Sequence, residues 1–130
     1  MILKKVNLSP YIVELWIIIT DDPAKDIPKL NKKYKGLEIQ MDAQTAAWTN
    51  DHFYDDNTLG VAFDVASFEP DVVAHEAVHI VNMTFQHAGY KLAGLNDEHQ
   101  AYFTGWIVGE IHKAYEEYKI KLHKKKYAGK

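Results

Sequence analysis

The chain has 130 residues, a length that suits one domain with a hydrophobic core of its own. Its net charge of −3 gives no reason to expect nucleic acid as a specific partner, and its 15 basic residues are all lysine, which excludes guanidinium clamps for phosphate. The absence of cysteine excludes disulfides and thiolate metal sites and suits a reducing compartment, so we expect a cytoplasmic protein. The apolar run at residues 11–20 contains Glu14 and is too short to span a bilayer, so no membrane partner is expected.

The first half of the chain is predicted to contain several strands and one helix. Residues 11–20 are rich in β-branched and aromatic side chains, and because both faces are mostly apolar they predict a central strand. A helix is expected from Asp21 or Asp22 to Gly36, in which Pro28 either makes a kink or begins a shorter helix. The remaining elements are short strands at residues 37–41 and 46–49, and a loop or hairpin tip at residues 50–58.

Residues 59–64 alternate large side chains with small or polar ones, as a half-buried strand does. Gly60 and Ala62 leave one face of this strand nearly bare, so another segment can approach its backbone closely. That segment is either a helix packed on the sheet or an extended peptide bound along the strand, and the pattern allows both.

Two long helices are predicted in the second half of the chain. Pro70 suits the first turn of a helix over residues 70–88. Asn96 is a suitable N-cap for a second helix over residues 97–118. Residues 119–130 carry six lysines and are expected to form a frayed, solvated tail of the single domain.

The motif on which function depends is His75-Glu76-Ala77-Val78-His79, an H-E-x-x-H sequence within the first of these helices. Residues four apart lie on one face of a helix, so His75 and His79 can turn their imidazoles toward one metal ion. Zinc suits neutral imidazole ligands, and Glu76 is placed to accept a proton from a water molecule beside the metal.

A catalytic zinc site of this kind needs a third protein ligand. The metzincin class takes a third histidine from the same helix, but Asn82 and Phe85 occupy the glycine and histidine positions of its motif here. His87 lies about 12 Å along the helix axis from His79, too far to share its metal. The third ligand is therefore expected from the following helix.

That helix opens with three candidate ligands, Asp97, Glu98 and His99. The face that begins at Glu98 continues with Ala101, Gly105 and Gly109, which form a groove of small residues suited to close helix packing. If the helix of the two histidines occupies this groove, Glu98 meets the metal. We therefore expect Glu98 to be the third ligand, with Asp97 and His99 as alternatives.

His75, Glu76 and His79, followed by Glu98 and then Ala101, form a pattern that resembles the gluzincin side of the zincin metallopeptidases. The pattern is especially similar to compact members encoded by bacteriophages and mobile elements, and the resemblance covers residues 58–112. It implies an α+β fold: a small zincin-like domain with a short mixed or antiparallel sheet of three or four strands, packed on the H-E-x-x-H helix and on a following helix that carries the glutamate. It also implies that residues 59–64 form the edge strand along which an extended substrate pairs.

The resemblance further implies a metallopeptidase with Zn²⁺ as cofactor, Glu76 as general base and a protein or peptide as substrate. Tyr102, one turn beyond Glu98, is the first candidate to donate a hydrogen bond to the oxyanion, and the alternative for it is ordinary packing with its phenol at a polar rim. Weaker candidates for the oxyanion role are His112, Tyr90 and His52. The alternative is a zincin-fold binding or inhibitory protein that uses zinc structurally. The pattern predicts neither cleavage specificity nor oligomeric state.

Overall fold

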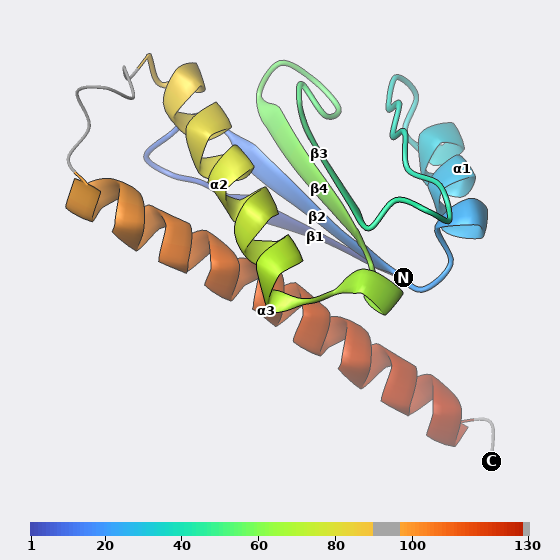
Figure 1. Ribbon diagram of the computed structural model, residues 1–130. Helices are drawn as coiled ribbons and strands as arrows, with labels where there is room; N and C mark the ends of the chain where they lie inside the picture. The colour runs from blue at the N-terminus through green and yellow to red at the C-terminus, as the bar shows by residue number, and fades with distance from the viewer. Residues whose placement is uncertain (90–96, 129–130) are drawn as a thin grey trace.

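The computed structural model describes residues 1–89 and 97–128, with Asp97 described by its backbone alone. Its four strands form one mixed sheet in the order β1-β2-β4-β3, in which β2 and β4 are parallel and the outer strands pair antiparallel to their neighbours (Figure 1). The predicted α+β class is therefore confirmed, and of the mixed or antiparallel sheet of three or four strands that was expected, the structure has a mixed one of four. The elements are β1 (Ile2–Asn7), β2 (Glu14–Thr20), α1 (Pro23–Lys33), β3 (Ala47–Asp51), β4 (Thr58–Asp64), a short 3-10 helix η1 (Val65–Ser67), α2 (Pro70–His87) and α3 (Asp97–Ala128).

The sheet separates two hydrophobic clusters. Leu15, Ile17 and Ile19 of β2 pack in the larger cluster with α2 and α3, whereas Trp16 and Ile18 pack in the smaller cluster with α1. This alternation follows from the two-residue period of a strand, which sends successive side chains to opposite faces. β2 lies between β1 and β4 and is buried on both faces, so the predicted central strand is confirmed.

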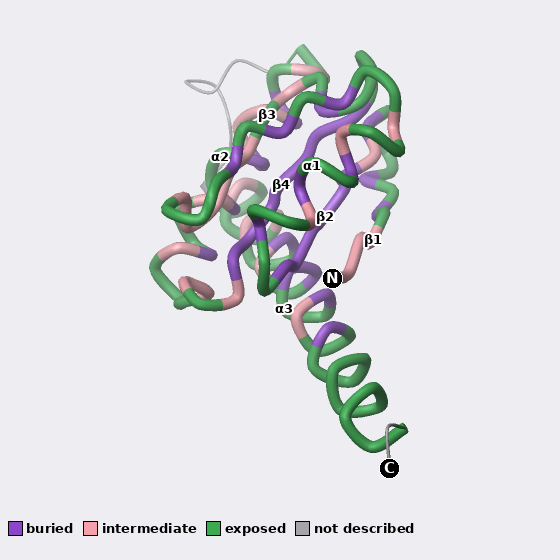
Figure 2. The backbone as a smooth tube through the Cα atoms, turned by 90° about the vertical axis from the view of Figure 1, so that its right-hand side faces the viewer, coloured by how far each residue is buried: buried purple, intermediate pink, exposed green. Residues whose placement is uncertain are grey.

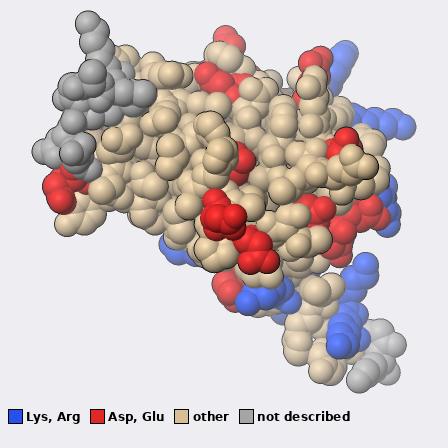
Figure 3. Space-filling view, in the orientation of Figure 1, with Lys and Arg blue, Asp and Glu red and all other residues tan. Residues whose placement is uncertain are grey.

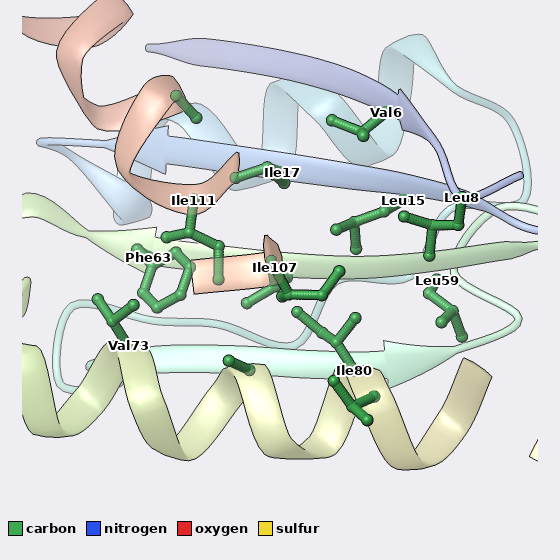
Figure 4. Packing of buried hydrophobic residues seen from close by; sticks show 14 of the residues in the cluster. Val6, Leu8, Leu15, Ile17, Leu59, Phe63, Val73, Ile80, Ile107 and Ile111 are labelled. Carbon is green, nitrogen blue, oxygen red and sulfur yellow. The ribbon is translucent and has the colours of Figure 1, made fainter. Parts of the chain in front are cut away.

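The larger cluster holds α2 against the sheet. It thereby determines which way the opposite, exposed face of α2 points. Val73, Ala77 and Ile80 of α2 meet Ile107 and Ile111 of α3 over the sheet (Figure 4). These side chains recur at helical spacing, and burial of each large one contributes roughly 1.5–3 kcal/mol. The orientation of the H-E-x-x-H residues therefore depends on this core.

The strand at residues 59–64 is not an edge strand, so that prediction was wrong. β4 lies between β2 and β3, and the edge on this side of the sheet is β3. The bare face of β4 is covered by Phe53, from the loop that joins β3 to β4, since a Cβ at Gly60 would lie 1.9 Å from the Phe53 ring. An aromatic side chain, rather than a helix or a bound peptide, accounts for the glycine.

The groove of small residues predicted on α3 does not receive α2. α3 packs instead through Ile107, Ile111 and Ala114, while Gly105 and Gly109 are exposed and a Cβ at either would meet nothing within 4 Å. The neighbouring stripe of large apolar side chains offers more area to bury, which decides the packed face.

Three further segments differ from expectation. Residues 2–7 form β1, which was not predicted, and residues 37–41 are buried at alternate positions without joining the sheet. The lysine-rich segment is not frayed: α3 continues as a solvated helix to Ala128 (Figure 2). Residues Pro23–Lys33 form one helix, α1, with Pro28 inside it, so the shorter helix that begins at Pro28 is not observed. The predicted N-cap Asn96 lies outside the described residues, and within the described ranges no helix is long and apolar enough to cross a membrane.

Candidate metal centre

α2 presents His75 and His79 on its exposed face, one turn apart. Their Nε2 atoms are 3.1 Å apart and their ring centroids 4.7 Å apart. Two nitrogens bound to one tetrahedral zinc stand about 3.3 Å apart, because each lies about 2.0–2.1 Å from the metal. The two imidazoles therefore fit a shared zinc ion with little movement of either ring.

Glu76 lies on the flank of α2 that faces the edge strand. Thr49 of β3 donates a short hydrogen bond from its hydroxyl to Glu76 Oε2. Glu76 and His75 also line a hollow of about 390 Å³, together with Ala46, Ala47, Asp71 and Val72. The carboxylate is thus held at an open cavity between the edge strand and the histidine pair, where a reactant can reach it. No motif or spacing in the sequence singles out Thr49.

The three candidates for the third ligand have different surroundings. His99 accepts or donates a hydrogen bond of 2.8 Å with the Tyr11 hydroxyl and stacks on Phe85, which directs its ring away from a shared metal. Glu98 is exposed, but its carboxylate is not within 4.8 Å of both His75 and His79 ligand atoms. The side chain of Asp97 lies outside the described residues.

The candidates for the oxyanion donor are not gathered at this hollow. Tyr102 is 76% exposed and lines a different, mainly apolar cavity with Tyr11 and Trp106. His112 contacts the Phe68 ring edge-on beyond η1. His52 lies near the C-terminal end of α2, with its ring centroid 5.6 Å from that of His87, and Tyr90 lies outside the described residues.

A second group of potential ligands lies where β3 and α2 end. This group consists of Asp51, His52 and His87, each of which offers a ligand atom within 4.8 Å of the other two. Among the described histidines and acids, no other group of three has its ligand atoms this close together. Asp51 Oδ1 is 2.5 Å from His87 Nε2, and Asp51 Oδ2 is 3.7 Å from His52 Nε2. The spacing along the helix had excluded His87 as a ligand of the His75/His79 metal and assigned it no other role.

Two spacings in the sequence are compatible with the position of this second group beside the first. Glu76 and His87 are 11 residues apart, about three helical turns, so they share one flank of α2. Thr49 and Asp51 are two residues apart and so share one face of a strand. The two pairs meet only because β3 lies beside that flank of α2, which neither spacing reveals.

The surface charge over α2 favours a cation. α2 contains Asp71 and Glu76 and no lysine. In the view of Figure 3, acidic side chains and no lysine appear over α2, whereas lysines gather toward α1 and along α3. A divalent ion would therefore approach the histidine pair without a nearby basic cluster to repel it.

In comparisons with protein-family models, with curated proteins and with solved structures, the chain has no match.

Proposed function

We propose that this protein is a zinc-dependent metallopeptidase with a small zincin-like domain. The observation that carries the proposal is the convergence of His75 Nε2 and His79 Nε2 to 3.1 Å, with the Glu76 carboxylate at a hollow beside them. At 3.1 Å the two ring nitrogens form a hydrogen bond with each other, and a shared zinc ion would use the same convergence of both nitrogens in place of that bond.

In this proposal His75, His79 and Glu98 hold the zinc ion. When bound, zinc supplies Lewis-acid activation of water and of a peptide carbonyl. Glu98 must then come closer to the histidine pair than the described structure has it, through its side chain or the first turn of α3. Asp97 remains the alternative ligand.

Glu76 acts as general base and then as general acid. Its carboxylate takes a proton from the attacking water and returns it to the leaving amine, so that a neutral amine departs. Thr49 positions Glu76 through its hydroxyl, and the Thr49 hydrogen bond keeps one carboxylate oxygen facing the edge strand. Tyr102 lines a different cavity from the one that Glu76 lines. Its role as a donor to the oxyanion therefore stays a prediction.

The edge strand supplies the substrate-binding element that was first expected at residues 59–64. β3 pairs with β4 on one side only, so its other edge has backbone groups available for an extended peptide. Because Ala47 lines the hollow and Thr49 contacts Glu76, a peptide paired with β3 would pass beside the base.

Substitution of Glu76 by Gln tests the proposal. We expect Glu76→Gln to bind zinc as the wild type does and to lose at least about 100-fold in cleavage of a mixed peptide library, because the base is gone and the ligands remain. Mass spectrometry measures both quantities. Glu116→Gln, an exposed acid on α3, serves as the matched control and should cleave normally.

Zinc content distinguishes substitution of a metal ligand from substitution of the general base. His75→Ala and His79→Ala should each lose one equivalent of zinc together with activity. Glu98→Gln and Asp97→Asn should differ, and the variant with the larger loss of zinc affinity identifies the third ligand. Wild-type turnover in Glu76→Gln, or unchanged zinc content in His75→Ala, would overturn the proposal.

The second candidate is a binding or inhibitory protein in which zinc is structural. The hydrogen bond from Thr49 to Glu76 favours it, since that contact also braces β3 against α2. This second function would be supported if the zinc-loaded wild type cleaves no library peptide and binds a partner through β3.

A further inference from the structure

We propose that Asp51, His52 and His87 form a second binding site for a divalent transition-metal ion, which fastens the edge strand β3 to the C-terminal end of α2. The site is independent of the proposed peptidase activity. His87 lies eight residues beyond His79, about 12 Å along the helix axis, so the two sites cannot share an ion.

The donor set suits such an ion. Two imidazoles and one carboxylate are typical ligands of zinc and related first-row metals, with one position open to water. The side chain of His87 is 17% exposed, that of Asp51 30% and that of His52 60%, so the group is open on one side for entry of an ion. The Asp51–His87 pair would have to separate by roughly 0.8 Å to reach ligand spacing around zinc.

His52 also has the outer partner that metal-bound histidines commonly have. Its Nε2 faces Asp51, while its Nδ1 lies 3.4 Å from Asp56 Oδ1. The Asp56 side chain is 97% exposed, and on closing to hydrogen-bond distance of Nδ1 it would hold the tautomer that leaves Nε2 free to bind a metal. Outer partners of this kind contribute about 10- to 100-fold to affinity. A simple ion pair between His87 and Asp51 would require neither His52 nor Asp56.

The backbone holds His52 in a conformation that side chains rarely adopt. Its φ is 48°, in the left-handed region. The adjacent Phe53 is buried, and the loop is fixed by Thr58 Oγ1, which accepts hydrogen bonds from the N–H groups of Tyr54 (2.7 Å) and Asp55 (2.9 Å). Uncommon conformations of this kind cluster at ligand sites. The backbone that carries His52 is therefore fixed before any ion arrives, which lowers the entropy cost of binding.

The experiment counts zinc bound by purified protein after dialysis against micromolar Zn²⁺, with elemental analysis and calorimetry. The His75→Ala/His79→Ala double variant should retain one equivalent of zinc, and its melting temperature should still rise when zinc is added. His52→Ala and His87→Ala should each remove one equivalent from the wild-type chain, with at least a 100-fold loss of affinity. Asp56→Asn should retain the site with about a 10-fold loss.

His123→Ala, on the exposed end of α3, is the matched control and should bind zinc as the wild type does. If the His75→Ala/His79→Ala variant fails to fold, the difference of one equivalent between wild type and His87→Ala decides the question. Equal zinc content in those two proteins, or zinc affinity that is unchanged in both His52→Ala and Asp56→Asn, would overturn the second site. Failure of the peptidase proposal would appear instead as unchanged zinc content in His75→Ala or as wild-type turnover in Glu76→Gln, and neither result bears on the second site.

Discussion

Side chains connect the edge strand to α2 at two points, and each point involves a residue of one of the two proposed sites. Thr49 contacts Glu76 near the middle of α2, and Asp51 contacts His87 at its end. Because both partners on β3 point toward α2, a shift of the strand by one residue would turn them to the opposite face. The register of Asp51 with Leu59 and Thr49 with Val61 therefore determines the geometry of both sites.

Tyr118 gives a residue-scale prediction that does not depend on metal. Its hydroxyl donates a hydrogen bond of 3.0 Å to Asp21 Oδ2, and burial, followed by this contact, raises the pKa of Tyr118 to about 12. The unfolded chain loses this proton near pH 10, whereas the folded protein holds it to about pH 12. The free energy of unfolding contributed by Tyr118 is thus complete below pH 10 and is lost as the pH rises toward 12.

Tyr118→Phe should therefore be about 1 kcal/mol less stable than the wild type at pH 7, because one hydrogen bond is missing. Its stability should fall less steeply between pH 10 and 12, since it has no phenol to ionise. Urea unfolding at a series of pH values measures the difference. Parallel pH profiles for the two proteins would contradict the role of the phenol.

At the scale of elements, α3 is stabilised by packing on one face and weakened by its composition on another. Ile107, Ile111 and Ala114 are fully buried, while Gly105 and Gly109 face solvent. Interior glycines cost a helix roughly 1 kcal/mol each relative to alanine. Since neither glycine is required by a close contact, α3 has room for stabilisation.

Gly105→Ala and Gly109→Ala should each raise the free energy of unfolding by up to about 1 kcal/mol. Gly60→Ala in β4 is the matched contrast: its Cβ would lie 1.9 Å from the buried Phe53 ring, so we expect a loss of roughly 1–3 kcal/mol or more. Urea midpoints of the three variants test both signs. Destabilisation by alanine at both α3 positions would show that the groove is occupied after all.

At the scale of the whole molecule, α3 extends beyond the body of the domain. Its last buried residue is Tyr118, and the following turns to Ala128 are exposed (Figure 2). The contact from Lys121 Nζ to the Met1 carbonyl, 2.9 Å, is an exposed one. Solvated helix without a packed face contributes little to the stability of the fold.

A chain that ends after His123 should therefore melt within about 3 °C of the full chain, less than a change of 1 kcal/mol produces at this size. A chain that ends after Lys113 loses the buried Ala114 and Tyr118 and should melt far lower or not fold. Circular dichroism follows both transitions. A large loss in the longer truncation would assign the exposed turns a role in the fold.

The sequence by itself determined the elements whose signal is local. The apolar run before Thr20 indicated a central strand because both of its faces must be buried. The spacing of His75 and His79 placed two imidazoles on one helical face because a helix repeats every 3.6 residues. The α+β class was implied by the resemblance of the H-E-x-x-H pattern, and the mixed sheet and its covering helices agree with it.

The tertiary structure alone decided which elements are neighbours. It made β3 the edge strand in place of β4, turned the glycines of α3 to solvent, and brought Asp51 and His52 to His87. These outcomes depend on how strands and helices compete for one shared core, and the competition is settled by total buried area rather than by the pattern of any single segment.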